Sequence, residues 1–249
     1  MKLAGLVEYD GAGFAGWATQ PDRRTVEGVL SEALRTVLRQ PVRLSVAGRT
    51  DAGVHASGQV VSFEAETGIP PSLIAYKATA LSPEDLALRR CVEVPDGFDA
   101  RRSAVSRSYE YRLVNDEVRP VLLRGRAAYE PRRLDFDLLA EAGQMVRGSH
   151  DFRAFTPSRG YHVRFERVVT ESSWTGEGDL LTYRVTADSF LYGMVRTLVG
   201  TMREVALGRR SLERFGALLS RGRRSEAGPA DVARGLTLTG VGYEERLWR

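Results

Sequence analysis

The chain is organised around Gly48-Arg49-Thr50-Asp51-Ala52-Gly53-Val54-His55-Ala56-Ser57-Gly58-Gln59-Val60-Val61. This stretch lies between two apolar runs, 42–47 and 59–64, whose composition predicts β-strands. Its acid, guanidinium and imidazole are framed by glycines, which tolerate sharp turns and let a ligand approach the main chain. We expect the loop to present one carboxylate, that of Asp51, rigidly at the bottom of a cleft. The plainer alternative is an ordinary connection in which Asp51 caps a turn.

The composition of the chain is that of a globular protein. Its 249 residues are 43% hydrophobic and 27% charged, which suits one large domain or two small ones with a substantial core. No apolar run is long enough to cross a bilayer, and the first residues do not form a signal peptide. We therefore expect a cytoplasmic protein with no membrane partner.

The sequence has few residues of the types that bind metals, and it lacks a typical nucleotide-binding motif. Cys91 is the only cysteine, which excludes an internal disulfide and a thiolate cluster, and His55, His150 and His162 are too scattered to predict a zinc site. The glycine-rich segment 10–17 lacks the Gly-x-x-x-x-Gly-Lys-Ser/Thr pattern of a phosphate-binding loop. We expect neither a metal nor a cofactor.

The charge balance favours a polyanionic partner. The formal net charge is +4 with a sequence pI of about 9.4. Lys2 and Lys77 are the only lysines among 36 basic residues, and arginine pairs with phosphates in two contacts and stacks on bases. A genome rich in G and C produces the same bias, so the arginines alone do not decide the partner.

The hydrophobic periodicity predicts an α+β protein with a mixed, mainly antiparallel sheet built from two similar halves flanked by helices. The predicted helices are 26–38, 71–81, 134–147, 190–207 and 211–220. The predicted strands are 2–9, 42–47, 59–64, 87–94, 108–114, 165–174, 180–187 and 236–243. We place the N-terminal half at 1–105 and the C-terminal half at 106–249, within one continuous catalytic unit.

One residue of the second half is a candidate to act with Asp51. Arg196 lies in a helix whose neighbouring residues are apolar, where a buried arginine needs a carboxylate partner, and Asp51 is the natural choice. The alternative is that Arg196 reaches solvent at the edge of the helix. Tyr109 lies on an alternating strand, where the plain interpretation is a cross-strand aromatic of the core.

The chain resembles the TruA family of tRNA pseudouridine synthases from end to end. The motifs that carry the resemblance are Tyr9-Asp10-Gly11…Phe14-Ala15-Gly16-Trp17 with Arg24-Thr25-Val26-Glu27-Gly28-Val29-Leu30, Gly48-Arg49-Thr50-Asp51-Ala52-Gly53-Val54-His55-Ala56, Phe98-Asp99-Ala100-Arg101 with Arg107-Ser108-Tyr109-Glu110-Tyr111, Phe190-Leu191…Met194-Val195-Arg196, and Gly235-Leu236-Thr237-Leu238…Val241-Gly242-Tyr243. The family isomerises uridines 38, 39 and 40 in the anticodon stem-loop. The resemblance therefore implies the pseudouridine synthase fold and a homodimer that binds tRNA.

The resemblance also implies roles for individual residues. Asp51 is expected to be the catalytic aspartate and Arg196 its basic partner, while Tyr109 packs against the target base. Arg49 is expected to enter the RNA stack where the base leaves. Further substrate contacts are implied within the matched motifs, at His55, Arg24 and Arg107.

Isomerisation of uridine needs neither cofactor nor metal, because nothing is oxidised and no group is lost. A single carboxylate serves either as nucleophile or as base and charge stabiliser, and both a sugar-centred and a base-centred route remain open. Other functions compatible with the sequence are a synthase for another RNA and a non-catalytic RNA-binding protein of the same fold. A metal-dependent hydrolase fits poorly, because further clustered carboxylates or histidines are missing.

Overall fold

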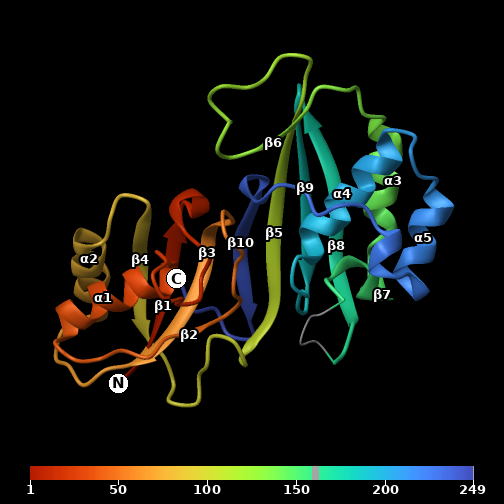
Figure 1. The fold of residues 1–249 in the computed structure, drawn as a ribbon. Coiled ribbons are helices and arrows are strands. Elements are labelled where there is room, and N and C mark those ends of the chain that lie inside the picture. The colour runs from red at the N-terminus through yellow and green to blue at the C-terminus, as the bar shows by residue number, and fades with distance from the viewer. Residues whose placement is uncertain (159–162, 249) are drawn as a thin grey trace. The chain divides into compact units, whose positions relative to one another are not determined.

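The computed structural model describes residues 1–158 and 163–248 (Figure 1). Within these ranges the helices are α1 (Val26–Leu38), α2 (Pro71–Leu81), α3 (Phe136–Met145), α4 (Met194–Ala206) and α5 (Leu212–Arg221). The strands are β1 (Lys2–Tyr9), β2 (Ser45–Val46), β3 (His55–Glu64), β4 (Leu86–Glu93), β5 (Ala104–Asn115), β6 (Ala128–Glu130), β7 (Gly148–Asp151), β8 (Glu166–Glu177), β9 (Leu180–Ala187) and β10 (Leu236–Tyr243). They form a mixed, mainly antiparallel sheet, so the predicted α+β class is confirmed.

The chain divides into two compact units. Unit 1 is Met1–Arg107 with Thr237–Arg249, and unit 2 is Ser108–Leu236. The expected division at 105/106 differs from this one chiefly at the C-terminus, where the last strand returns to unit 1. The reason is parallel pairing between β10 and β3, with Thr237 opposite His55 and Leu238 opposite Ala56.

Unit 1 carries the glycine-framed loop on a sheet with the strand order β4-β1-β3-β10, and β2 pairs with β3. Helix α1 begins after Thr25, whose hydroxyl accepts a hydrogen bond from the Gly28 amide and so caps the helix. The apolar face of α1 is buried at Leu30 and Leu34. Helix α1 packs on α2, and α2 packs on β4 (Figure 1).

Unit 2 has the strand order β5-β9-β8-β7, and the short strand β6 runs parallel to β5. Helix α3 packs on β8, on α4 and on α5 (Figure 1). Helix α4 is buried around most of its circumference, because apolar and small residues occupy successive positions from Thr197 to Met202. It therefore forms the centre of the core of unit 2.

Several boundaries differ from the sequence prediction for local reasons. Helix α4 begins at Met194 instead of 190, because Gly193 has φ +68°, a left-handed conformation that a helix does not continue through. Helix α3 begins two residues late, because the Asp135 side chain caps it by accepting the Leu138 amide. Strand β3 begins at His55, so the second part of the central stretch is strand rather than loop. Strands β6 and β7 are too short to show a period and were not predicted.

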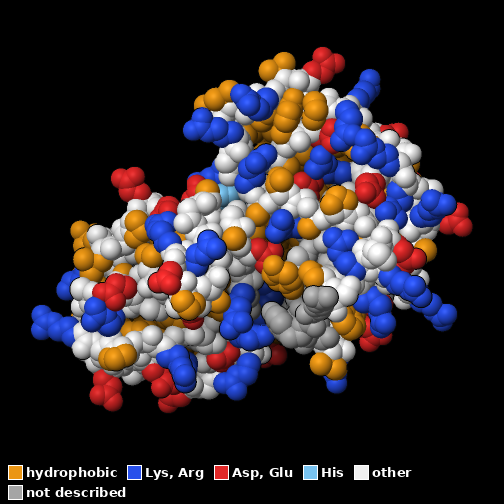
Figure 2. Space-filling view, viewed as in Figure 1, with side chains coloured by type: hydrophobic (Ala, Val, Ile, Leu, Met, Phe, Trp, Pro, Cys, Tyr) orange, Lys and Arg blue, Asp and Glu red, His pale blue; other side chains and the backbone are white. Residues whose placement is uncertain are grey.

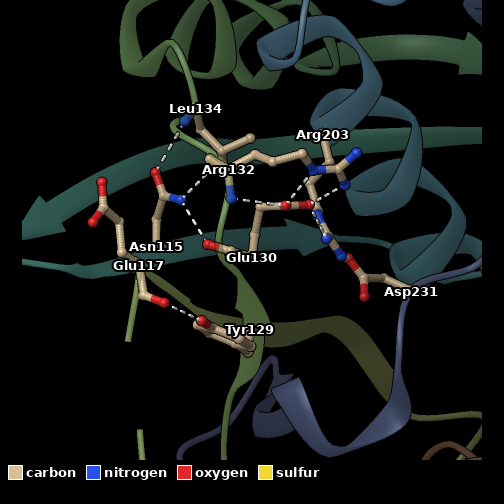
Figure 3. Close-up of polar contacts among 8 residues, drawn as sticks. All are labelled: Asn115, Glu117, Tyr129, Glu130, Arg132, Leu134, Arg203 and Asp231. Carbon is tan, nitrogen blue, oxygen red and sulfur yellow. Dashed lines mark hydrogen bonds and ion pairs between the residues drawn. The ribbon is translucent and has the colours of Figure 1, made fainter. Parts of the chain in front are cut away.

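A buried ionic cluster, defined as Glu130, Arg203 and Asp231, lies inside unit 2 (Figure 3). One guanidinium nitrogen of Arg203 donates to Glu130 Oε2 at 2.6 Å and the other to Asp231 Oδ2 at 2.5 Å. Arg132 donates to both carboxylate oxygens of Glu130 at 2.7 Å. Burial by itself raises the pKa of Glu130, but the hydrogen bonds from Arg132 and Arg203 outweigh it and lower that pKa to about 2.

The cluster makes folding stability depend on acid pH. The pKa of the Glu130 carboxyl is 4.5 in the unfolded chain and about 2 in the folded protein. Its contribution to the free energy of unfolding is therefore complete above the unfolded pKa and is lost as the pH falls toward 2. That contribution is on the order of 3 kcal/mol. We expect Glu130→Gln to be less stable than wild type at neutral pH and to lose less stability on acidification.

Urea unfolding between about pH 7 and about pH 3 measures this effect. Glu32→Gln is the matched control, because Glu32 also pairs with an arginine but is exposed to solvent. Parallel stability curves for wild type and Glu130→Gln would contradict the expectation.

Candidate active site

Asp51 is half-buried in a tight turn that connects β2 to β3 in unit 1. The turn is closed by a hydrogen bond from the Val54 amide to the Asp51 carbonyl at 3.1 Å. Gly53 has φ +78°, which lets the chain reverse there without strain. Asp51 therefore lies within the connection between β2 and β3, in a turn closed by its own carbonyl.

The glycine-rich segment 10–17 fixes the residue before Asp51. The Trp17 amide donates to the Thr50 carbonyl at 3.0 Å. Gly16 has φ +99°, and a Cβ there would come within 2.9 Å of the Thr50 carbonyl oxygen. Gly16 is therefore required both for its backbone angle and for the close approach of the two segments. The segment acts as a support for the Asp51 turn.

Two buried polar side chains complete this support from β1 and β3. The Tyr9 hydroxyl and Thr50 Oγ1 lie 2.7 Å apart, and Gln59 Nε2 donates to the Gly48 carbonyl at 2.7 Å. Burial raises the pKa of Tyr9 to about 12, so its hydroxyl stays protonated at neutral pH. Side chains of β1 and β3 thus hold residues 48–50, on the N-terminal side of Asp51, in place.

His55 follows Asp51 by one turn and is only 2% exposed. The Gly11 amide donates to its Nδ1 at 3.0 Å, and Asp10 Oδ1 lies 3.0 Å from the same nitrogen. Asp10 Oδ1 also accepts the Ala12 amide, so residues 10–12 are held together at this point. Through the hydrogen bond from the Gly11 amide, His55 is an anchor for residues 10–12.

The three arginines predicted in unit 1 differ in their surroundings. Arg49 is exposed beside Asp51. Arg24 makes two hydrogen bonds to Asp85, at 2.7 and 2.8 Å, and its guanidinium lies 4.1 Å from the centre of the Phe14 ring. Arg107 donates to the Ala47 carbonyl at 2.8 Å and to other main-chain carbonyls. Arg24 and Arg107 are thus held in place by contacts within unit 1.

Tyr109 and Arg196 belong to unit 2. Tyr109 is half-buried on β5, and its ring meets Phe190 edge to face with centroids 5.0 Å apart. Arg196 is half-buried on the first turn of α4, and its Nε donates to the Asp231 carbonyl at 2.6 Å. The ion pair of Arg196 with Asp51 of unit 1 stays a prediction.

The sequence did not indicate every residue that supports these groups. Tyr9, Thr50 and Gln59 lie inside matched motifs, but their buried polar contacts became visible only in the fold. Asp231 lies in a loop without periodicity, and no sequence signal pointed to it. His162 lies outside the described residues. Within 1–158 and 163–248 no group of three or more His, Cys, Asp or Glu is placed to hold a metal ion. In the same ranges no helix is long and apolar enough to span a bilayer.

Comparison with known proteins shows the relatives of this chain. A family model described as tRNA pseudouridine synthase matches residues 6–101 and 142–244. A tRNA pseudouridine synthase A of Gloeobacter violaceus is 41% identical over 245 residues, which cover 98% of this chain and 81% of that protein. A protein of the same name from Shewanella sediminis is 37% identical, and the match covers 99% of this chain and 94% of that protein. Another from Moorella thermoacetica is 39% identical, and the match covers 94% of this chain and 96% of that protein.

Both matched ranges include the elements described above: the first contains the Asp51 turn with its glycine-rich support, and the second contains α4 with Arg196. Identity of this level over nearly the whole of both chains shows common descent. The chain belongs to the tRNA pseudouridine synthase family, a family of isomerases.

Proposed function

We propose that this protein converts uridine to pseudouridine at positions 38, 39 and/or 40 in the anticodon arm of tRNA. The observation that carries the proposal is the match to proteins named tRNA pseudouridine synthase A over nearly the full chain. The glycine-framed turn that holds Asp51 supports it, because the chemistry needs one well-placed carboxylate. The enzyme is an isomerase without a redox step.

In the proposed reaction the bond between N1 of uracil and C1′ of ribose breaks, the base turns, and a bond from C5 to C1′ forms. The C5 hydrogen is lost as a proton and N1 gains one, so atoms and electrons balance. Asp51 acts as the catalytic carboxylate, either as nucleophile or as base. Arg196 acts as its partner, since a neighbouring guanidinium favours the ionised and oriented carboxylate.

The target base must leave its stack before Asp51 can reach it, at a cost of about a few kcal/mol. We assign Tyr109 as the aromatic surface on which the base packs, worth about 1–3 kcal/mol. Arg49, exposed beside Asp51, enters the space that the base leaves. His55 is buried and accepts the Gly11 amide, so its part is to anchor residues 10–12 beside the substrate, while Arg24 and Arg107 line the RNA path.

The surface charge supports an RNA substrate. Figure 2 shows Lys and Arg side chains spread over the face in view, with acidic side chains dispersed among them. Arginine makes up nearly all of this basic charge, and its fork suits phosphate oxygens. By the resemblance we also propose a cytoplasmic homodimer that binds tRNA, and sedimentation of the purified protein tests the dimer.

A synthase for another RNA is the second candidate, and product mapping separates the two. Chemical mapping of pseudouridine in total RNA from cells with and without the gene should show losses at tRNA positions 38–40. Losses confined to messenger or other RNA would favour the second candidate. If no pseudouridine is lost from any RNA and the protein still binds RNA, a non-catalytic RNA-binding protein would be favoured.

Asp51→Ala should abolish isomerisation and leave tRNA binding within a few fold, because the carboxylate does chemistry and contributes little to affinity. Tritium release from tRNA that carries 5-tritiated uridine measures loss of the C5 hydrogen. Asp96→Ala is the matched control, because Asp96 is an exposed acid of the same unit. Full activity of Asp51→Ala would refute the role of Asp51.

Tyr109→Phe should keep partial activity, because the stacking face remains, whereas Tyr109→Ala should lose most of it. Single-turnover rates with the same tRNA measure the difference. Tyr76→Ala, at a tyrosine 72% exposed on α2, is the control and should behave as wild type. Equal rates for wild type and both Tyr109 variants would mean that Tyr109 only packs against Phe190.

A further inference from the structure

The segment 228–232 packs against α4 and is hydrogen-bonded to it at two points. A Cβ at Gly200 would lie 1.9 Å from the Pro229 carbonyl oxygen, so the segment runs directly against the helix backbone there. The Gly228 amide donates to Thr201 Oγ1 at 3.0 Å. At the other end, the Asp231 amide donates to the Arg196 carbonyl at 2.9 Å. The segment and the first turns of α4 therefore form one rigid element.

Asp231 is the residue through which the segment 228–232 contacts the Arg196 side chain. Its carbonyl accepts from Arg196 Nε at 2.6 Å, and its carboxylate accepts from Arg203 at 2.5 Å. The next residue is held as well, because the Tyr111 hydroxyl donates to the Val232 carbonyl at 3.0 Å. The main chain and the side chain of Asp231 are thus both held in place.

Arg203 in turn is held by a framework that starts on β5 (Figure 3). Its second carboxylate partner, Glu130, ends β6 and is 1% exposed. The Asn115 amide group donates to the carbonyls of Glu130 and Arg132, each at 2.8 Å. The side chains thus form a continuous path from β5 and β6 through Arg203 to the carbonyl that orients Arg196.

The composition of the cluster argues against stability as its sole purpose. Buried ion pairs are often no more stabilising than apolar residues of the same volume. Within the described residues, the buried Nε of Arg203 has no hydrogen-bond acceptor, which adds an uncompensated cost. A geometry that is costly and yet leads to one side chain of the proposed active site is what positioning requires.

We propose that Asp231 and Arg203 are positioning residues that fix the direction of the Arg196 guanidinium for catalysis. The proposal rests on the proposed function, in which Arg196 is the partner of the catalytic carboxylate. Neither residue is assigned a contact with RNA. Their loss should therefore reduce kcat, by up to about 100-fold for a displacement of about 1 Å, with little change in KM.

The test compares Arg203→Met with Arg210→Met in the full-length protein. Arg210 pairs with Glu204 at 2.8 Å and is 16% exposed, so it is an arginine of similar burial whose carboxylate partner on α4 lies outside the ionic cluster. Two readouts are taken: the NMR signal of the Arg196 Nε–H group, assigned with Arg196→Lys, and kcat and KM for tRNA. The melting temperature of each variant records lost stability.

We expect Arg203→Met to shift the Arg196 signal, speed its exchange with water and lower kcat, and Arg203→Lys to recover part of each effect. Arg210→Met should lower the melting temperature without any of these three effects. If Arg203→Met does not fold, Asp231→Asn replaces it, because it keeps the backbone carbonyl and the side-chain volume while it weakens the contact with Arg203.

An unchanged Arg196 signal and kcat in Arg203→Met or Asp231→Asn would overturn the proposal, as would the same changes in Arg210→Met. Failure of the proposed function has a different signature, because the wild-type protein would then release no tritium from any tRNA. The Arg196 signal is still measured in that case and decides the positioning role by itself.

Discussion

The buried hydrogen bond between the Tyr9 hydroxyl and Thr50 Oγ1 is the contact on which the surroundings of Asp51 depend. Tyr9 ends β1, and Thr50 immediately precedes Asp51, so this bond ties the turn to the sheet. A buried hydroxyl that loses its partner costs about 1–3 kcal/mol, which keeps the two groups together. With the close approach of Gly16, the backbone at Asp51 has one stable path.

In unit 2 a different kind of interaction fixes the geometry of the core. Its core is apolar around α4, but a buried ionic cluster connects that helix to β6 and to the segment that carries Asp231. Ion pairs of arginine are directional, since the guanidinium donates its hydrogen bonds to carboxylates in its own plane. Apolar packing tolerates small shifts that such a fork does not. We regard this directionality as the reason for charge in the core of unit 2.

The chemistry that we propose explains why buried polar contacts hold residues in fixed positions in both units. Isomerisation with one carboxylate has no metal to polarise the substrate, so the rate depends on how well the acid, its cationic partner and the base are placed. Tyr9, Thr50 and Gln59 serve the acid in this scheme, and Asp231 with Arg203 serves the cation. Neither set is assigned a direct contact with RNA.

The sequence by itself determined the features that depend on neighbours along the chain. Helices α1 and α2 and strands β9 and β10 begin and end where the periodicity predicts, because caps, prolines and alternation act locally. The family resemblance likewise follows from short motifs, including the one around Asp51. Only the tertiary structure decided that β10 returns to β3, that His55 is a buried anchor, and that Glu130, Arg203 and Asp231 meet. Those contacts join residues tens of positions apart, and long-range pairing leaves no period in the sequence that would predict it.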